Sequence, residues 1–252
     1  MAGMRDSVAV VTGGTAGIGF AVAQELVARE ARVVITGRRQ QQLDDAVAAL
    51  GERASGVRAD VASSAEMDAV FAYVSERHGR LDTVVANAGM GRHAELGAIT
   101  DEDFDQTFAI NVKGVLHSVQ KAFPLMRPGG TITVIASTAT IRGSFGLSLY
   151  GGSKAAVRNF VRSWIQETAG SGIRINVISP GAVDTEALRE ALAGAVGSDG
   201  VEAQLAAIGS SSPLGRIAQP KEIAAAAVFL ASAEASYIHG AELFVDGGTA
   251  QV

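Results

Sequence analysis

The chain has 252 residues, of which 48% are hydrophobic, and its 21 Lys and Arg against 26 Asp and Glu give a formal net charge of −5. A nucleic-acid-binding surface needs a basic stripe, and the only adjacent pair of Lys or Arg residues is Arg38-Arg39. The longest strongly apolar run, residues 223–231, is far shorter than the ~20 residues of a membrane span. Cysteine is absent, which excludes disulfides and thiolate ligands, and we expect no metal site. We therefore expect a soluble, cytoplasmic protein that binds neither nucleic acid nor a membrane.

Short apolar runs alternate with longer helical patterns along the whole chain. The predicted strands are residues 8–12, 32–36, 56–59, 83–86, 131–135, 174–178 and 242–245, and the predicted helices are residues 18–29, 40–50, 65–78, 103–126, 150–169 and 221–231. Most of the strands are continuous apolar runs, which is typical of strands buried on both faces. The alternation predicts an α/β fold, a Rossmann-like doubly wound parallel sheet with helices on both faces. No linker or repeat interrupts it, so we expect a single domain over residues 1–252.

The first predicted strand leads into a glycine-rich turn, residues 12–19, at the end of the sheet where such folds bind their ligands. Its glycines follow the spacing G-x-x-x-G-x-G. Gly13 permits a sharp turn, Gly17 lets the backbone approach a pyrophosphate, and Gly19 lets the helix pack on the strand. The helix N-terminus adds free N–H groups for the phosphates. The turn predicts a nucleotide-binding site, and a glycine-rich turn without a ligand is the alternative.

Tyr150 and Lys154 lie four residues apart at the start of a predicted helix, so their side chains face the same way. A neighbouring ammonium stabilises a phenolate, and we expect it to lower the Tyr150 pKa from ~10 toward the range of a general acid-base. The pair alone is weak evidence, because such a pair also suits a solvated helix face. Two further residues strengthen it: Ser137 follows the predicted strand 131–135, and Asn111 interrupts a helical pattern in which Asn is a mediocre helix former.

Together these motifs resemble the short-chain dehydrogenase/reductase family, in the subgroup with Tyr-x-x-x-Lys. The resemblance extends over residues 8–248 and includes, in order, residues 12–19, Asp60-Val61, Asn87-Ala88-Gly89, Asn111-Val112-x-Gly114, Ser137, Tyr150-x-x-Ser153-Lys154, Pro180-Gly181 with Thr185, and Val245-Asp246-Gly247-Gly248. Several motifs in the right order are far more specific than any single one. The resemblance implies an oxidoreductase that transfers a hydride between a nicotinamide cofactor and a ketone or secondary alcohol.

The resemblance also implies a role for each of four catalytic residues. Tyr150 would donate a proton to a carbonyl oxygen or take one from an alcohol, and Ser137 would orient that oxygen. Lys154 would bind the nicotinamide ribose and depress the Tyr150 pKa. Asn111 would interrupt its helix and hold a water that links Lys154 to solvent as a proton relay.

By the same resemblance, the other candidate site residues would contact the cofactor. Those at the pyrophosphate are Gly13, Thr15, Gly17, Ile18 and Gly19; those at the adenosine are Asp60, Val61, Asn87 and Gly89; and those near the carboxamide are Pro180, Gly181, Val183 and Thr185. Asp60 has an alternative of nearly equal weight, because an Asp at this place also caps the helix that follows it.

The residues after the second predicted strand indicate which cofactor is used. An acid about 20 residues beyond the glycine turn would bind the ribose 2′-OH of NAD and repel a 2′-phosphate. This chain has Gly37-Arg38-Arg39 there, and its first acid is Asp44, within the next predicted helix. Gly37 leaves room beside the ribose, Arg38 offers a planar fork suited to a phosphate, and Arg39 adds charge. We expect NADP(H) to be preferred and NAD(H) to be possible; the alternative is that both arginines are solvated.

The substrate is a small molecule that we expect to be shaped by residues 90–95, 138–149 and 186–213. The last segment is rich in Ala, Gly and Ser, which suits a mobile lid, with a poorly ordered surface loop as the alternative. The residues expected to line the substrate site are apolar: Ile141, Phe145, Leu147, Leu188 and Leu192. Arg92 and Arg142 are the cations in these segments whose position the sequence does not fix. A neutral ketone or alcohol is therefore favoured as the substrate. One competing function is reduction of 3-oxoacyl groups on acyl carrier protein, which needs a basic docking surface. A second is a catalytically silent nucleotide-binding protein, although such members typically lose the tyrosine or lysine.

Three residues depart from the family pattern or stand outside it. Gly152 replaces a small residue such as Ala and is expected to widen the space beside Tyr150. His239 stands where Thr is common and is expected to be a satisfied loop residue. His93 is expected to be exposed, with contact to substrate as the alternative.

A homotetramer built from two-fold interfaces is implied by the resemblance. The helices 103–126 and 150–169 would pair across one interface, because they carry more apolar surface than one core-facing stripe needs: Phe104, Phe108, Val115, Phe123, Phe160 and Trp164. The alternative is that both helices are fully buried in a monomer.

Overall fold

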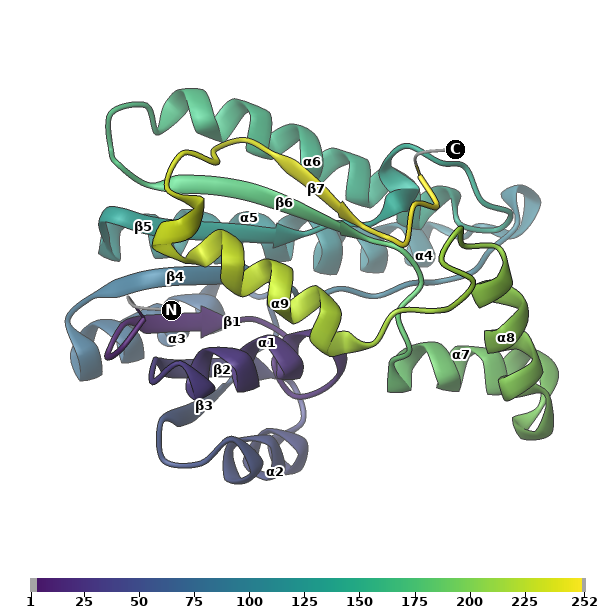
Figure 1. Cartoon of the computed structure of the whole chain (residues 1–252), viewed down its shortest axis with the longest axis horizontal. Helices are drawn as coiled ribbons and strands as arrows, with labels where there is room; N and C mark the ends of the chain where they lie inside the picture. Colours follow the sequence, from purple (N-terminus) through teal and green to yellow (C-terminus); the bar gives the residue numbers. More distant parts are fainter. Residues whose placement is uncertain (1–3, 251–252) are drawn as a thin grey trace.

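The computed structural model describes residues 4–250 and places all seven predicted strands in one parallel sheet (Figure 1). Their order across the sheet is β3-β2-β1-β4-β5-β6-β7, so the chain reverses its direction of travel between β1 and β4. This confirms the Rossmann-like doubly wound fold and puts the switch point at the carboxyl ends of those two strands. The bounds are β1 Val8–Val11, β2 Arg32–Gly37, β3 Ala54–Arg58, β4 Leu81–Ala86, β5 Met126–Ile135, β6 Arg174–Pro180 and β7 Glu242–Val245.

Helices cover both faces of the sheet, which explains why its strands are apolar without alternation. In β1, Val8 and Val10 point into one hydrophobic core, while Ala9 and Val11 point into the other, and all four are buried. The first core is closed by α3 (Ser64–His78), α5 (Gly114–Ala122) and α6 (Ser148–Glu167). The second is closed by α1 (Gly17–Ala28), α2 (Gln40–Leu50) and α9 (Pro220–Ala231), of which α1 and α9 lie side by side (Figure 1).

The prediction of one helix over residues 103–126 is wrong, because the segment divides into four pieces. A capping box of Thr100 and Asp103 starts α4 (Asp101–Phe108), and a π-helical turn, Ala109–Lys113, separates it from α5. A 3-10 turn, Phe123–Leu125, carries Pro124 and ends the helical stretch, so that β5 begins at Met126. The apolar periodicity continues through all of these turns, and it therefore could not locate the breaks.

The segment expected to be a lid folds into two helices beyond the carboxyl ends of the strands (Figure 1). They are α7 (Glu186–Val196) and α8 (Val201–Ser210), joined by the short 3-10 turn Ser198–Gly200. Arg189 of α7 donates to both carboxylate oxygens of Asp184, at 2.6 and 2.9 Å, and to Glu202 of α8 at 2.6 Å. These bonds hold the two helices to each other and to the chain that leads into them. Among residues 4–250, every helix is too short or too polar to cross a membrane.

Candidate active site

The glycine-rich turn after β1 is hydrogen-bonded to the loop after β4, across the switch point. The Thr12 hydroxyl accepts from the backbone N–H groups of Asn87 and Ala88, at 3.1 and 3.2 Å. In return, Asn87 Nδ2 donates to the carbonyl oxygens of Thr12 and Gly13, at 3.0 and 3.1 Å. Asn87 thus fixes the shape of the turn with its side-chain amide, which is a more definite role than the cofactor contact expected for it.

Backbone conformation explains two glycines of the turn, and steric crowding explains a third. Gly13 and Gly17 have φ of 63° and 54°, a conformation that favours glycine. A Cβ on Gly19 would lie 2.2 Å from the Gly13 carbonyl oxygen, so helix and turn could not approach with a larger residue there. The N-cap of α1 is Ala16, and no side chain caps the helix. The first N–H groups of α1 are therefore available to an anion, which fits a pyrophosphate.

At the end of β2, Arg38 and Arg39 are both exposed, and within residues 4–250 neither forms an ion pair with a carboxylate. The first acid, Asp44, accepts from Gln40 at 2.8 Å within α2. A Cβ on Gly37 would lie 2.5 Å from the Thr15 methyl group, so Gly37 is explained by packing of Thr15 as well as by room for a ribose.

Asp60 and Val61 lie in the loop between β3 and α3, and Asp60 does not cap that helix. The N-cap is Ser63, whose hydroxyl accepts from Glu66 N–H, so the capping alternative for Asp60 is wrong. Asp60 instead accepts from Ala62 N–H at 2.9 Å. Val61 is buried against Gly114, and its carbonyl oxygen accepts from His117 Nδ1 at 2.9 Å, which fixes the backbone at this position.

Three of the four candidate catalytic side chains, Ser137, Tyr150 and Lys154, meet at the carboxyl end of β5 and the first turns of α6. The Ser137 hydroxyl accepts from Ala139 N–H at 3.2 Å, which leaves its proton free to be donated to another oxygen. Lys154 is buried, and its Nζ donates to the Ile135 carbonyl at 2.9 Å and lies 5.8 Å from the centre of the Tyr150 ring. One strand end and one helix thus carry the whole acid-base group.

Burial governs the protonation of this group. It raises the pKa of Tyr150 above its usual value, an effect that a hydrogen bond with Ser137 partly offsets. Burial outweighs any stabilisation of the phenolate by the Lys154 ammonium, so the expected net lowering of the Tyr150 pKa is not found. Burial also lowers the pKa of Lys154 to about 8, because the ammonium is removed from water. Near neutral pH the phenol keeps its proton, and the ammonium is within about one pH unit of losing its own.

Asn111 lies in the π-helical turn between α4 and α5, fully buried. Its amide donates to the Met90 carbonyl at 2.9 Å and to the Ser153 hydroxyl at 3.0 Å, and it accepts from Met90 N–H at 2.8 Å. The side chain therefore holds the loop after β4 against α6. A Cβ on Gly89, in that same loop, would lie 3.1 Å from Lys154 Nζ. The Asn-Ala-Gly motif thus brings backbone within reach of the Lys154 ammonium.

Comparison with known proteins shows the family to which the chain belongs. The family model described as "Enoyl-(Acyl carrier protein) reductase" matches residues 13–250. The chain belongs to the short-chain dehydrogenase/reductase family. It is similar to Oxidoreductase asL5 of Sarocladium schorii, 44% identical over 99% of this chain and 98% of the relative. It is also similar to galactitol 2-dehydrogenase of Agrobacterium fabrum (36% identical, over 97% and 98%) and to the crystal structure of levodione reductase (30% identical, TM-score 0.93, covering 98% and 99%).

In this dehydrogenase/reductase, the residues expected near the carboxamide lie at the end of β6 and in the segment that follows it. Pro180 ends the strand, and a Cβ on Gly181 would lie 2.9 Å from the Asp246 backbone, which explains the glycine. Val183 is buried and forms a bridge with Ala218, at the base of the two-helix segment. Thr185 caps α7 through its hydroxyl, and its methyl group would lie 3.2 Å from a Cβ on Gly17. The start of α7 therefore lies directly on the glycine turn.

The departures from the family pattern have separate explanations. Gly152 faces open space, since a Cβ there would meet nothing within 4 Å, whereas a Cβ on Gly151 would lie 3.0 Å from the Ala139 carbonyl oxygen. His239 accepts from Ile175 N–H at 3.1 Å, which confirms the satisfied loop residue. His93 is exposed, as expected, and its ring packs at a tilt of 48° against Phe145, with ring centres 5.7 Å apart.

A charged network that was not predicted from the sequence lies next to the turn that follows Ser137. Glu242 of β7 accepts from the hydroxyls of Thr140 and Ser179, at 3.0 and 2.7 Å, and pairs with Arg158 of α6. Its side chain is 10% exposed. The only sequence signal was a Glu at the start of an otherwise apolar edge strand. The network links the turn after Ser137 to α6 one turn beyond Lys154.

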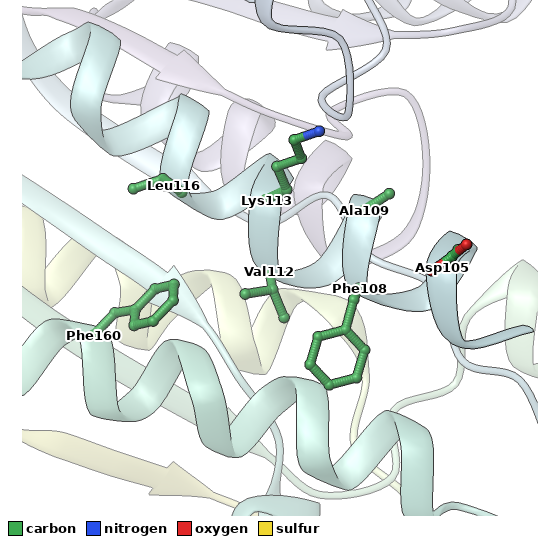
Figure 2. A pocket seen from close by; sticks show the side chains of 7 residues that line it. All are labelled: Asp105, Phe108, Ala109, Val112, Lys113, Leu116 and Phe160. Atoms are coloured by element: carbon green, nitrogen blue, oxygen red, sulfur yellow. The ribbon is translucent and has the colours of Figure 1, made fainter. Parts of the chain in front are cut away.

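A hollow of about 480 Å³ lies outside the active site, between the α4–α5 stretch and α6 (Figure 2). It is lined mainly by apolar side chains: Asp105, Phe108, Ala109, Val112, Lys113, Leu116 and Phe160. Phe104 is 46% exposed and stacks on Phe108 with ring centres 4.4 Å apart. Val115 is buried in the core and Phe123 packs against it, so the expectation that these two add to a free apolar face is wrong.

Proposed function

We propose that this dehydrogenase/reductase is an NAD(P)-dependent enzyme that interconverts a neutral ketone and its secondary alcohol, with Tyr150 as the general acid-base. The observation that carries the proposal is the meeting of Ser137, Tyr150 and Lys154 next to the loop after β4, which is itself hydrogen-bonded to the glycine turn. Two features of the fold fit a dinucleotide: the uncapped N-terminus of α1 and the glycines whose crowding leaves no room for side chains.

The residues divide the chemistry as follows in the direction of reduction. Ser137 and Tyr150 both donate hydrogen bonds to the carbonyl oxygen of the substrate, and Tyr150 then gives it a proton. The raised Tyr150 pKa keeps the phenol protonated for this step, and the Lys154 ammonium stabilises the phenolate that results. A nicotinamide cofactor, when bound, supplies or accepts the hydride. Asn111 holds the loop after β4 against α6, and this contact keeps Lys154 in place.

Replacing Tyr150 by Phe tests the assignment of the acid-base. The ring still packs, but the proton donor is gone, so we expect kcat to fall ~10²-fold or more. Cofactor binding, followed by quenching of Trp164 fluorescence or by the fluorescence of the reduced cofactor, is expected to change little. A variant that keeps more than about a tenth of the wild-type kcat would show that another group transfers the proton.

We propose NADP(H) as the preferred cofactor, because Arg38 and Arg39 are exposed cations at the end of β2 and Asp44 lies further on, in α2. The ratio of kcat/KM for NADPH to that for NADH measures the preference. We expect Arg38→Ala to lower this ratio ~10-fold or more, since a charge-assisted bidentate contact to a phosphate is lost. Arg29→Ala, which removes an arginine paired with Glu25 in α1, is the matched control and is expected to leave the ratio unchanged. A wild-type preference for NADH contradicts the proposal.

The description of the family model names acyl carrier protein, so a 3-oxoacyl thioester belongs in the same assay. We expect a simple ketone to be reduced with a higher kcat/KM than a 3-oxoacyl thioester. The opposite order would favour the acyl reductase.

A further inference from the structure

Exposed apolar side chains are concentrated around the acid-base group. Within residues 4–250, eight large hydrophobic residues are exposed, and five of them lie on or next to the three segments that follow β4, β5 and β6. These five are Leu96 (88% exposed), Ile141 (45%), Phe145 (76%), Val196 (48%) and Leu214 (67%). Exposed apolar surface that gathers in one place marks a binding site, whereas scattered residues need no explanation.

Contacts between the first two segments bring the loop of residues 91–96 and the loop that carries Phe145 together near Tyr150. Gly91 lies against the Tyr150 ring, because a Cβ there would be 4.0 Å from Tyr150 Cδ2. Two residues further on, the His93 ring packs at a tilt against Phe145, and Ala94 N–H donates to the Gly146 carbonyl at 2.8 Å. Gly146 has φ of 68°, and a Cβ there would lie 2.1 Å from His93 Nε2, so only glycine lets the imidazole lie on this loop.

The third segment joins the same region through the turn after β7. Arg142, next to Ile141, donates to the Thr249 carbonyl, and Leu214 N–H donates to the Gly247 carbonyl at 3.3 Å. Ser212 also donates to that carbonyl, at 3.2 Å. The turn after β7 therefore lies between the loop that carries Phe145 and the end of the two-helix segment.

Every Lys or Arg side chain on these segments, as far as the structure describes them, already has an acceptor. Arg92 pairs with Asp103 at 2.6 Å, Arg142 binds the Thr249 carbonyl, and Arg189 is held by Asp184 and Glu202. Arg216 pairs with Glu222 in the same way. In contrast, Glu95 and Glu190 are exposed acids. A substrate carboxylate or phosphate would meet exposed acids here, and Arg142, whose guanidinium has no carboxylate partner among residues 4–250, is engaged by the Thr249 carbonyl.

We propose that the substrate is a neutral, largely apolar ketone or alcohol that carries a ring, and that Phe145 and Leu96 hold this ring beside Tyr150. The inference rests on the proposed function and narrows it. It disfavours polyols and sugars, which need convergent hydrogen-bonding groups, and it disfavours anionic substrates, which need a free cation. His93 acts here as the support on which Phe145 rests.

Three probes of different chemistry test the substrate class: 2-tetralone, a carboxylate-bearing derivative of 2-tetralone, and galactitol in the oxidation direction. We expect kcat/KM for 2-tetralone to exceed that for each of the others at least 100-fold. We expect Phe145→Ala to lower kcat/KM for 2-tetralone at least tenfold, since apolar contact with the ring is lost, and Phe145→Leu to restore most of it. The KM for the cofactor is expected to stay unchanged in both variants.

Tyr237→Ala is the matched control, because it removes a fully exposed aromatic ring outside the three segments. It is expected to leave kcat/KM for 2-tetralone as in the wild type. Preference for galactitol, with turnover that Tyr150→Phe abolishes, overturns the substrate class and leaves the proposed function standing. Preference for the carboxylate derivative, with the same dependence on Tyr150, overturns the substrate class and the neutral charge of the proposed substrate, and leaves the assignment of Tyr150 as acid-base standing. Equal effects of Phe145→Ala and Tyr237→Ala also overturn the substrate class. Absence of turnover with every alcohol and ketone overturns the proposed function and this inference together.

Discussion

Lys154 shows most clearly how one residue can work against the stability of the fold that holds it. Its Nζ has a single protein acceptor, the Ile135 carbonyl, and it is almost completely buried. The lowered pKa, about 8 against 10.5 in water, measures how strongly this environment disfavours the ammonium. A buried cation beside a phenol is suited to stabilising a phenolate. Its burial costs free energy of folding, which the packing of the surrounding residues offsets.

The pH dependence of unfolding tests this account. Between about pH 8 and pH 10.5 the unfolded chain binds a proton at Lys154 that the folded chain has released, so folding is favoured as the pH rises. Relative to Lys154→Met, the wild type is therefore expected to gain up to about 3 kcal/mol of unfolding free energy across this window and to show a constant difference below it. Urea unfolding of both proteins at several pH values measures the difference. Parallel curves would show that the Lys154 pKa is not lowered.

At the scale of elements, the sequence predicted all seven strands and placed each motif at the correct strand end, because apolar runs and glycine turns are local signals. Periodicity failed where a long-range contact decides local structure. It predicted one helix over residues 103–126, although the resemblance implied that Asn111 interrupts this helix. The structure confirms the interruption as a π-helical turn, in which the Asn111 side chain bonds the backbone of Met90, 21 residues earlier in the chain. The network of Glu242 also depends on long-range contacts, since its partners come from three other segments of the chain. Its location therefore follows from the fold and from no local pattern.

Glu242→Gln is expected to weaken this network while keeping the shape of the side chain. Arg158, whose side chain is only 26% exposed, would lose its counter-charge, and we expect a loss of about 2 kcal/mol of stability. The turn after Ser137 would also be held less firmly, so kcat should fall several-fold. Asp68→Asn, which breaks the more exposed pair with Lys121, is the control and should cost less than about 1 kcal/mol. Thermal unfolding and steady-state kinetics measure both effects, and equal losses in the two variants would contradict the prediction.

At the scale of the molecule, α4, the π-helical turn and α6 together present an apolar face that the hydrophobic cores of the described chain do not use. Phe108 and Phe160 line the hollow in Figure 2, and the exposed Phe104 stacks on Phe108. A second copy of the same face would cover it, in agreement with the two-fold interfaces that we proposed from the sequence. Phe160 also packs on Trp164, with ring centres 5.6 Å apart, so the aromatic surface continues along α6.

We expect a homotetramer of four 25.8-kDa chains in light scattering at micromolar concentration. Phe160→Glu is expected to shift this mass downward, because it puts a charge into the covered face. Arg162→Glu, at an exposed position of the same helix, is the matched control. A wild-type mass near 26 kDa would contradict the assembly.

The hydrogen bonds between Thr12 and Asn87 have a consequence for the order of events in folding. The two residues lie 75 positions apart, and the turn after β1 acquires its shape only when the loop after β4 is in place. A nascent chain that has emerged only as far as β3 therefore has the glycine signature but no formed phosphate site. Contacts of this separation form late, because a long loop must close first. The cofactor that we propose would consequently not act as a template for β1 to β3; it would bind only after β4 has completed this part of the sheet.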